Sequence, residues 1–282
     1  TGFLTYISLA ILMVVSSTLT KLESFKPILW GLMISGFVNV AYCLWVVLFG
    51  DFIGWTNPYK NILGTFGNPN FIGAFLGIFI SVYVAYLITP KLNVRYRIVG
   101  LLVLLIAFYE VRSSHAVQGV VVSAGGIALV GFFFIRSRTK SNLIPTIYSS
   151  VIAFLGTLSV LGALQIGPLT SIVYKTSVSL RGEYWQAAIN MGKMNPWSGV
   201  GMDSYGDWYR EARGEVSTLR TGPDRISNSA HNIFLDISST AGLLAGLSYV
   251  SLVLLTGFWA ARYLKKSKRY SGRDVALISS WF

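Results

Sequence analysis

Arginine and histidine side chains gather in and just after one polar stretch of the chain, residues 167–230. These residues are Arg181, Arg210, Arg213, Arg220, Arg225 and His231. Guanidinium groups form paired hydrogen bonds with phosphate oxygens and stay charged at any physiological pH. An imidazole with a pKa near neutrality can take a proton from a sugar hydroxyl group. Together these residue types could bind a pyrophosphate group and activate a hydroxyl nucleophile.

Further polar residues stand where two pairs of apolar runs meet. One short turn carries Arg112, His115 and Gln118 beside Glu110. An ionisable residue at such a place is costly and often functional, although Arg112 could also be an anchor whose charge reaches the membrane interface. The second connection ends in Asn68, Pro69 and Asn70. We predict Asn70 as the N-cap of the helix that follows.

Each of these residues also has a purely structural explanation. The arginines of the polar stretch could pair with the acidic residues around them, which are Asp203, Asp207, Glu211, Glu215 and Asp224. A lone histidine such as His231 or His115 is often a helix-capping or interfacial residue. Two histidines without cysteines or spaced carboxylates make a poor metal site, so we predict no metal and no cofactor. The chain has no P-loop, dinucleotide, zinc-protease or serine-nucleophile motif.

The composition indicates which kind of fold holds these residues in position. The chain has 282 residues, of which 53% are hydrophobic and 12% charged, and its mean hydropathy is +0.59. Soluble domains carry about 25% charged residues. The apolar residues form long runs, which are typical of an all-α polytopic membrane protein. The net charge of +12 does not indicate nucleic-acid binding, because the basic residues cluster in connections between these runs.

The apolar runs predict the membrane spans and their orientation. We expect seven spans, near residues 3–20, 27–49, 71–89, 98–113, 115–135, 143–166 and 233–261, and an eighth beginning near Val275. If these spans alternate, one side of the membrane receives most of the basic residues: Lys21, Lys26, Lys91, Arg95, Arg97, Arg136, Arg138, Lys140, Arg262, Lys265, Lys266, Lys268, Arg269 and Arg273. The positive-inside rule makes that side cytoplasmic. The polar stretch 167–230 is then extracytoplasmic.

Residues 1–282 are expected to form a single transmembrane domain that is a fragment of a longer chain, with 167–230 as an ordered loop inside it. Trp185, Trp197, Tyr205, Trp208 and Tyr209 argue against disorder, because disordered segments are poor in aromatic residues. The stretch 180–194 is expected to be helical, since Trp185 and Ile189 are spaced for one face. A long ordered loop in a compact protein is usually functional.

Several short motifs in this order resemble the family of O-antigen ligases and O-antigen polymerase-related membrane proteins. The sequence Gly67-Asn68-Pro69-Asn70 precedes a span, and Arg181-Gly182-Glu183-Tyr184-Trp185 opens the predicted helix of the loop. The run from Asn195 to Tyr205 and the run from Ser229 to Leu235, before Gly242, complete the pattern. The resemblance extends over residues 64–246. It departs from the family at the outer turn, where many members carry a Ser-Arg-Gly-like run and this chain has Arg112 to Gly119.

The resemblance implies a GT-C-like bundle and a glycosyltransferase of the bacterial inner membrane. Such enzymes move a glycan from an undecaprenyl-diphosphate carrier to an acceptor hydroxyl on a lipid or glycan, as in lipopolysaccharide and other polysaccharide biosynthesis, on the periplasmic side. By the same resemblance, Arg112 and Arg181 hold the donor pyrophosphate and His231 serves as the base, with His115 as an alternative to Arg112. The other expected substrate-binding residues are Arg210, Arg213, Arg220, Arg225, Gln118, Asn68, Asn70 and Asn232.

Other functions remain open at this point. A polymerase or a protein O-oligosaccharyltransferase would differ from a ligase only in its acceptor. A transporter would place polar residues near the middle of the bilayer, whereas the predicted spans here are nearly free of charge. A sensor or scaffold would need neither Arg181 nor His231.

Overall fold

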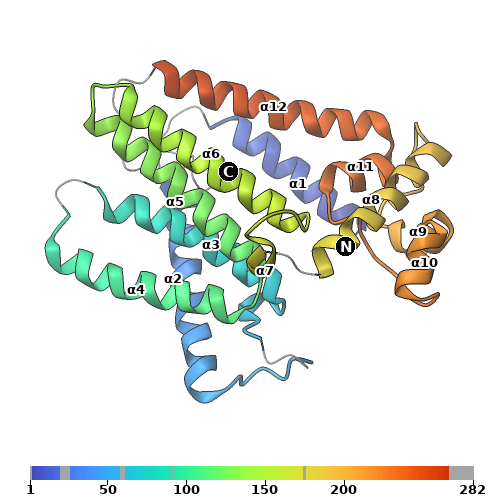
Figure 1. The fold of residues 1–282 in the computed structure, drawn as a ribbon, viewed down its shortest axis with the longest axis horizontal. Helices are drawn as coiled ribbons and strands as arrows, with labels where there is room; N and C mark the ends of the chain where they lie inside the picture. The colour runs from blue at the N-terminus through green and yellow to red at the C-terminus, as the bar shows by residue number, and fades with distance from the viewer. Residues whose placement is uncertain (1, 20–25, 58–60, 90–91, 174–175, 267–282) are drawn as a thin grey trace. The chain divides into compact units, whose positions relative to one another are not determined.

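The computed structural model describes residues 2–19, 26–57, 61–89, 92–173 and 176–266. Within these ranges the chain is helical and contains no strand (Figure 1). This confirms the all-α fold class. The span expected near Val275 lies outside the described residues.

Five helices of the described chain are long and apolar enough to cross a membrane, which confirms a polytopic membrane protein. They are α2 (Lys26–Phe49), α3 (Pro69–Leu87), α5 (Val117–Arg138), α6 (Leu143–Ala163) and the Leu243–Ala260 part of α12 (Leu243–Lys266). At 1.5 Å per residue, about 20 residues cross the hydrocarbon core. Two more helices match predicted spans, α1 (Gly2–Ser17) and α4 (Val94–Ser113).

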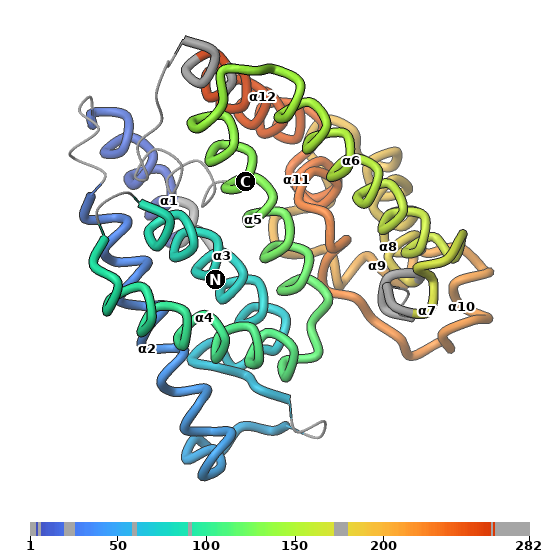
Figure 2. The backbone as a smooth tube through the Cα atoms, turned by 60° about the vertical axis from the view of Figure 1, so that its left-hand side comes forward, coloured from blue at the N-terminus to red at the C-terminus, as the bar shows by residue number. Residues whose placement is uncertain are grey.

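The chain divides into two compact units, which we name by their helices. The α2–α5 unit contains Thr18–Phe154, and the α8–α12 unit contains Leu155–Lys266 together with Thr1–Ser17. In the α2–α5 unit, α3 is the central helix and packs against α2, α4 and α5 (Figure 2). Its buried Leu76, Phe79 and Ile80 form one core with Cys43 of α2 and Ala107 of α4.

Small residues form the contact between α3 and α5. Gly73 and Gly77 on α3 face Gly119 on α5, and a Cβ at Gly119 would lie 2.7 Å from the carbonyl oxygen of Gly73. Further along, a Cβ at Gly126 would clash with the side chain of Ser81. Small residues spaced four apart let two membrane helices approach until their backbones touch. This seam fixes the start of α5, and with it the turn after α4.

The α8–α12 unit contains the polar stretch and is ordered over most of it. The helices are α7 (Thr170–Val173), α8 (Thr176–Met194), α9 (Tyr205–Ala212), α10 (Glu215–Thr221), α11 (Ile233–Ala241) and α12. The helix expected over 180–194 is therefore confirmed as part of α8. Helix α11 packs against both α8 and α12. The core between α8 and α9 contains Tyr184, Ala188, Met191, Tyr205 and Tyr209.

Two predictions made from the sequence are wrong in detail. The span expected over 233–261 is two helices, because the chain turns at Gly242 with a φ of 92°, a backbone conformation that favours glycine. The N-cap of α3 is Asn68 and not Asn70, since the Asn68 side chain accepts a hydrogen bond of 2.9 Å from the Asn70 amide. Pro69 then occupies the first helical position, where its missing N–H leaves no bond unmade.

The α3–α5 seam predicts a loss of stability when one methyl group is added. Gly119→Ala places a Cβ against the Gly73 backbone, which cannot rotate away, and we expect a destabilisation of about 1–3 kcal/mol. The matched control is Gly125→Ala on the same helix, where a Cβ meets nothing within 4 Å. Thermal unfolding of the purified variants in detergent would show a lower midpoint for Gly119→Ala alone. Equal midpoints would contradict the close packing.

Candidate functional site

Arg181 and His231, far apart in the sequence, lie close together in the α8–α12 unit. Arg181 stands on α8, one turn before Tyr184, and His231 lies two residues before the first residue of α11. The rings of Tyr184 and His231 pack with their centroids 5.4 Å apart. The Arg181 charge acts on the imidazole of His231. The structure therefore brings together two of the three residues expected to be catalytic.

The turn around His231 is held from both sides. Asn232 caps α11 by accepting hydrogen bonds from the amides of Phe234 and Leu235, at 3.1 and 3.3 Å. The Asp236 carboxylate accepts a 2.7 Å hydrogen bond from the Ala230 amide. Between them His231 has a φ of 52°, a left-handed conformation that is uncommon for a residue other than glycine. These contacts orient the imidazole.

Burial and the positive charge of Arg181 lower the pKa of His231 below its ordinary 6.5, against an opposing effect of the Asp236 carboxylate. Both causes disfavour the imidazolium form. The environment of His231 therefore favours the neutral imidazole. A neutral imidazole beside a guanidinium can accept a proton while the guanidinium holds an anion.

A tyrosine core supports the α8 side of this site. The Tyr205 hydroxyl donates a 2.7 Å hydrogen bond to the Tyr184 carbonyl oxygen. The ring of Tyr209 packs edge-on against Tyr184 at 5.8 Å. Helix α9 thus fixes the turn of α8 that carries Tyr184 and, beside it, Arg181.

Two other arginines of this stretch make structural contacts. Arg213 donates hydrogen bonds to the carbonyl oxygens of Gly222, Pro223 and Arg225, at 3.1, 2.6 and 3.0 Å. Arg220 forms an ion pair of 2.9 Å with Glu183, which also accepts a hydrogen bond from Ser217. These contacts hold α10 and the turn after it, so we assign both side chains to positioning that segment. Arg210 and Arg225 are exposed.

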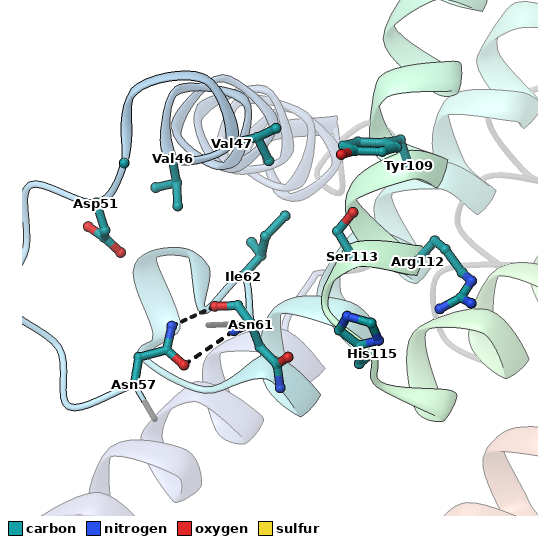
Figure 3. Close-up of a pocket in the computed structure, with 11 residues that line it drawn as sticks. Val46, Val47, Asp51, Asn57, Asn61, Ile62, Tyr109, Arg112, Ser113 and His115 are labelled. Carbon is teal, nitrogen blue, oxygen red and sulfur yellow. Dashed lines mark hydrogen bonds between the residues drawn. The ribbon is translucent and has the colours of Figure 1, made fainter. Parts of the chain in front are cut away.

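The residues expected around the outer turn lie in the α2–α5 unit. Arg112 and His115 are both exposed and line a pocket of about 760 Å³ (Figure 3). His115 has a φ of 55° and lies two residues before the first residue of α5, as His231 does before α11. Glu110 is fully buried in α4, so it does not share the exposed face of Arg112. Gln118 is exposed on the first turn of α5, and Asn70 is exposed on α3.

Sequence reasoning missed several residues around Arg181 and His231 and several residues of the pocket at Arg112 and His115. In the α8–α12 unit these are Asp236 and Tyr184, and an acid in the first turn after the His-Asn pair is the signal that could have found Asp236. In the pocket they are Asp51, Asn57, Asn61 and Tyr109. The first three lie in the connection between α2 and α3. Within the ranges given above, no group of three or more His, Cys, Asp or Glu side chains could hold a metal ion.

The contacts of Arg213 predict that it supports structure. Arg213→Met leaves three carbonyl oxygens without their donor, and we expect trypsin to cut the 213–226 segment of the folded protein faster than in the wild type. Arg210→Met serves as the control, because Arg210 is exposed and forms none of these bonds. Equal cleavage rates for the two variants would remove the structural assignment.

The environment of His231 predicts its titration. Because Arg181 lowers the pKa of His231, Arg181→Gln should raise it, and Asp236→Asn should lower it further. The chain has only two histidines, so imidazole NMR signals can be assigned with a His115→Gln variant. A His231 pKa above 6.5 in the wild type, or one that Arg181→Gln leaves unchanged, would contradict the geometry.

One of three comparisons with known proteins gives a match. Residues 111–250 match the family model described as O-Antigen ligase. A search of curated proteins and a search of solved structures each found no match. The matched residues include Arg112, Arg181 and His231. The resemblance drawn from the motifs is therefore confirmed by a family-model match over residues 111–250, which are similar to the O-antigen ligase family.

Proposed function

We propose that this protein transfers a glycan from an undecaprenyl-diphosphate carrier to an acceptor hydroxyl group at the outer face of a bacterial inner membrane. The observation that carries the proposal is the placement of Arg181 beside His231, within the residues that match the O-antigen ligase family model. The five apolar helices supply the membrane setting. The basic connections between the predicted spans support an outer position for residues 167–230.

Arg181 acts on the leaving group in this mechanism. When the bond between the anomeric carbon and the phosphate oxygen breaks, negative charge grows on the lipid diphosphate. A guanidinium fixed on α8 before the reaction stabilises that charge without having to reorganise. Arg112 is proposed to bind phosphate as well, from its place at the end of α4.

His231 acts on the acceptor. The acceptor oxygen forms a new bond to the anomeric carbon, while its proton passes to the neutral imidazole. Because the diphosphate occupies one face of the sugar, the hydroxyl attacks the opposite face, and the configuration at the anomeric carbon inverts. Asp236 holds the backbone turn on which His231 stands and favours the imidazolium that forms.

The proposal leaves the ligase and polymerase reactions chemically equivalent. In both, a hydroxyl attacks the anomeric carbon of a lipid-linked glycan, and only the molecule that carries the hydroxyl differs. We favour the ligase reaction because the matching family model is described as O-Antigen ligase.

Transfer should depend on Arg181 and His231. We expect His231→Ala and Arg181→Ala each to lower the rate at least 100-fold in an assay with undecaprenyl-diphosphate glycan and candidate acceptors, since each removes a group that acts on the reacting atoms. Lys193→Ala, an exposed cation on the same helix, is the control and should keep the wild-type rate. A His231→Ala protein that transfers glycan at the wild-type rate would refute the role of His231 as base.

The same assay tests the absence of a metal requirement. The groups assigned to the reaction are a guanidinium and an imidazole, so we expect the rate to be unchanged by EDTA. A rate that falls with EDTA and returns with a divalent cation would show that the diphosphate is stabilised by a metal ion instead.

A further inference from the structure

The pocket of the α2–α5 unit has a carboxylate on its inner side. It lies between the end of α2, the connection that follows α2 and the end of α4 (Figure 3). Its volume of about 760 Å³ is within the range of small-molecule sites, about 300–1,000 Å³. Asp51 and Arg112 both line it, but the Arg112 guanidinium is directed away from the cavity and from Asp51 (Figure 3). A ligand inside the pocket therefore meets the negative charge of Asp51, which attracts a cation.

The Asp51 carboxylate is fixed through one of its two oxygens. Oδ1 accepts hydrogen bonds from the Tyr42 hydroxyl at 2.7 Å and from the Ile53 amide at 2.9 Å. Oδ2 accepts no hydrogen bond from the residues that the structure describes. An ionised carboxylate has about four acceptor positions and no donor. Oδ2 is therefore held in place and is available to the N–H donors of a ligand.

The wall opposite Asp51 carries two hydroxyl groups, those of Tyr109 and Ser113 in the last two turns of α4. Tyr109 directs its hydroxyl toward Val47 on α2 (Figure 3). Neither hydroxyl forms a hydrogen bond with a residue in the described part of the chain. The His115 imidazole lies on the same wall. A hydroxyl group can donate and accept, so this wall suits the oxygen atoms of a ligand whose cationic end lies at Asp51.

The end of α2 is expected at the level of the lipid headgroups. Helix α2 is one of the helices long and apolar enough to cross a membrane, and it ends at Phe49, two residues before Asp51. Trp45, Leu48 and Phe49 are 50%, 62% and 70% exposed, so this end of the helix presents an apolar face outward. Aromatic side chains at the ends of spans lie at the membrane interface. A phospholipid whose chains lie along this face presents its headgroup beside Gly50 and Asp51.

We propose that this pocket binds the ethanolamine headgroup of a phospholipid, with the protonated amine on Asp51 and the phosphodiester oxygens at the hydroxyls of Tyr109 and Ser113. A primary ammonium group has three N–H donors, and its hydrogen bond to a carboxylate is strengthened by both charges. A choline headgroup has no N–H on its nitrogen, and a glycerol headgroup has no positive charge. The pocket therefore selects ethanolamine over both, and this selection does not depend on the proposed glycan transfer.

Asp51→Asn removes the proposed contact and keeps the internal ones. The asparagine carbonyl oxygen can still accept the hydrogen bonds of the Tyr42 hydroxyl and the Ile53 amide, whereas its NH2 group replaces Oδ2 and cannot accept from an ammonium. We expect this variant to fold as the wild type does, which thermal unfolding in detergent checks. Asp207→Asn, at an exposed acid on α9, is the matched control.

Binding is measured by native mass spectrometry of the purified protein with phosphatidylethanolamine, phosphatidylcholine and phosphatidylglycerol that carry the same acyl chains. We expect the wild type to bind phosphatidylethanolamine about tenfold more tightly than either other lipid. Asp51→Asn should weaken that binding about tenfold, as for the loss of one charge-assisted hydrogen bond, and leave phosphatidylglycerol unchanged. Asp207→Asn should bind as the wild type does. Equal binding of the three lipids by the wild type, or a preference that Asp51→Asn retains, overturns the proposal.

A soluble headgroup distinguishes a lipid from a small amine in solution. O-phosphoethanolamine has the same amine and phosphate but no acyl chains, so it should displace phosphatidylethanolamine only at concentrations far above that of the lipid. Weak displacement of this kind supports the phospholipid as the ligand. Binding of O-phosphoethanolamine that requires Asp51, without binding of the lipid, overturns the assignment to a phospholipid.

Discussion

The α8–α12 unit depends on one contact between two stretches of backbone. At Gly242 the joint between α11 and α12 lies directly against the Trp197 carbonyl, and any side chain at 242 would clash with it. The Leu243 amide donates to the Pro196 carbonyl oxygen at 2.8 Å, and the Val200 and Gly201 amides donate to the last turn of α11. The turn after α8 is thereby bonded to α11. Because α8 and α11 are joined in this way, Arg181 on α8 and His231 before α11 lie close together.

That placement has an electrostatic consequence. A guanidinium beside an imidazole lowers the imidazole pKa, so a group that is able to bind an anion also favours the proton-accepting form of its neighbour. Asp236 opposes this effect and, through the Ala230 amide, holds the turn. As the imidazole gains a proton, the same carboxylate stabilises the new charge. One small cluster can therefore serve the leaving group and the nucleophile of a transfer reaction.

The sequence was informative where local rules decide the structure. Long apolar runs predicted the spans and the aromatic residues predicted an ordered loop. The family motifs singled out Arg181 and His231, which the structure places close together. Features that depend on tertiary contact were missed or misplaced. The break at Gly242 requires knowing that the Trp197 backbone lies there, and the glycine seam requires the partner helix. The N-cap of α3 is Asn68 and not the predicted Asn70, because Pro69 suits the first helical position. Asp51 and Asn61 have no local signature and join a pocket only through folding.

An experimental structure of the protein with a non-hydrolysable undecaprenyl-diphosphate glycan analogue tests the central claim most directly. The account predicts a phosphate oxygen within about 3 Å of the Arg181 guanidinium. It also predicts the His231 imidazole on the opposite side of the anomeric carbon from the diphosphate, with room for a hydroxyl between them. A diphosphate bound away from Arg181, or a His231 imidazole directed away from the sugar, would contradict it.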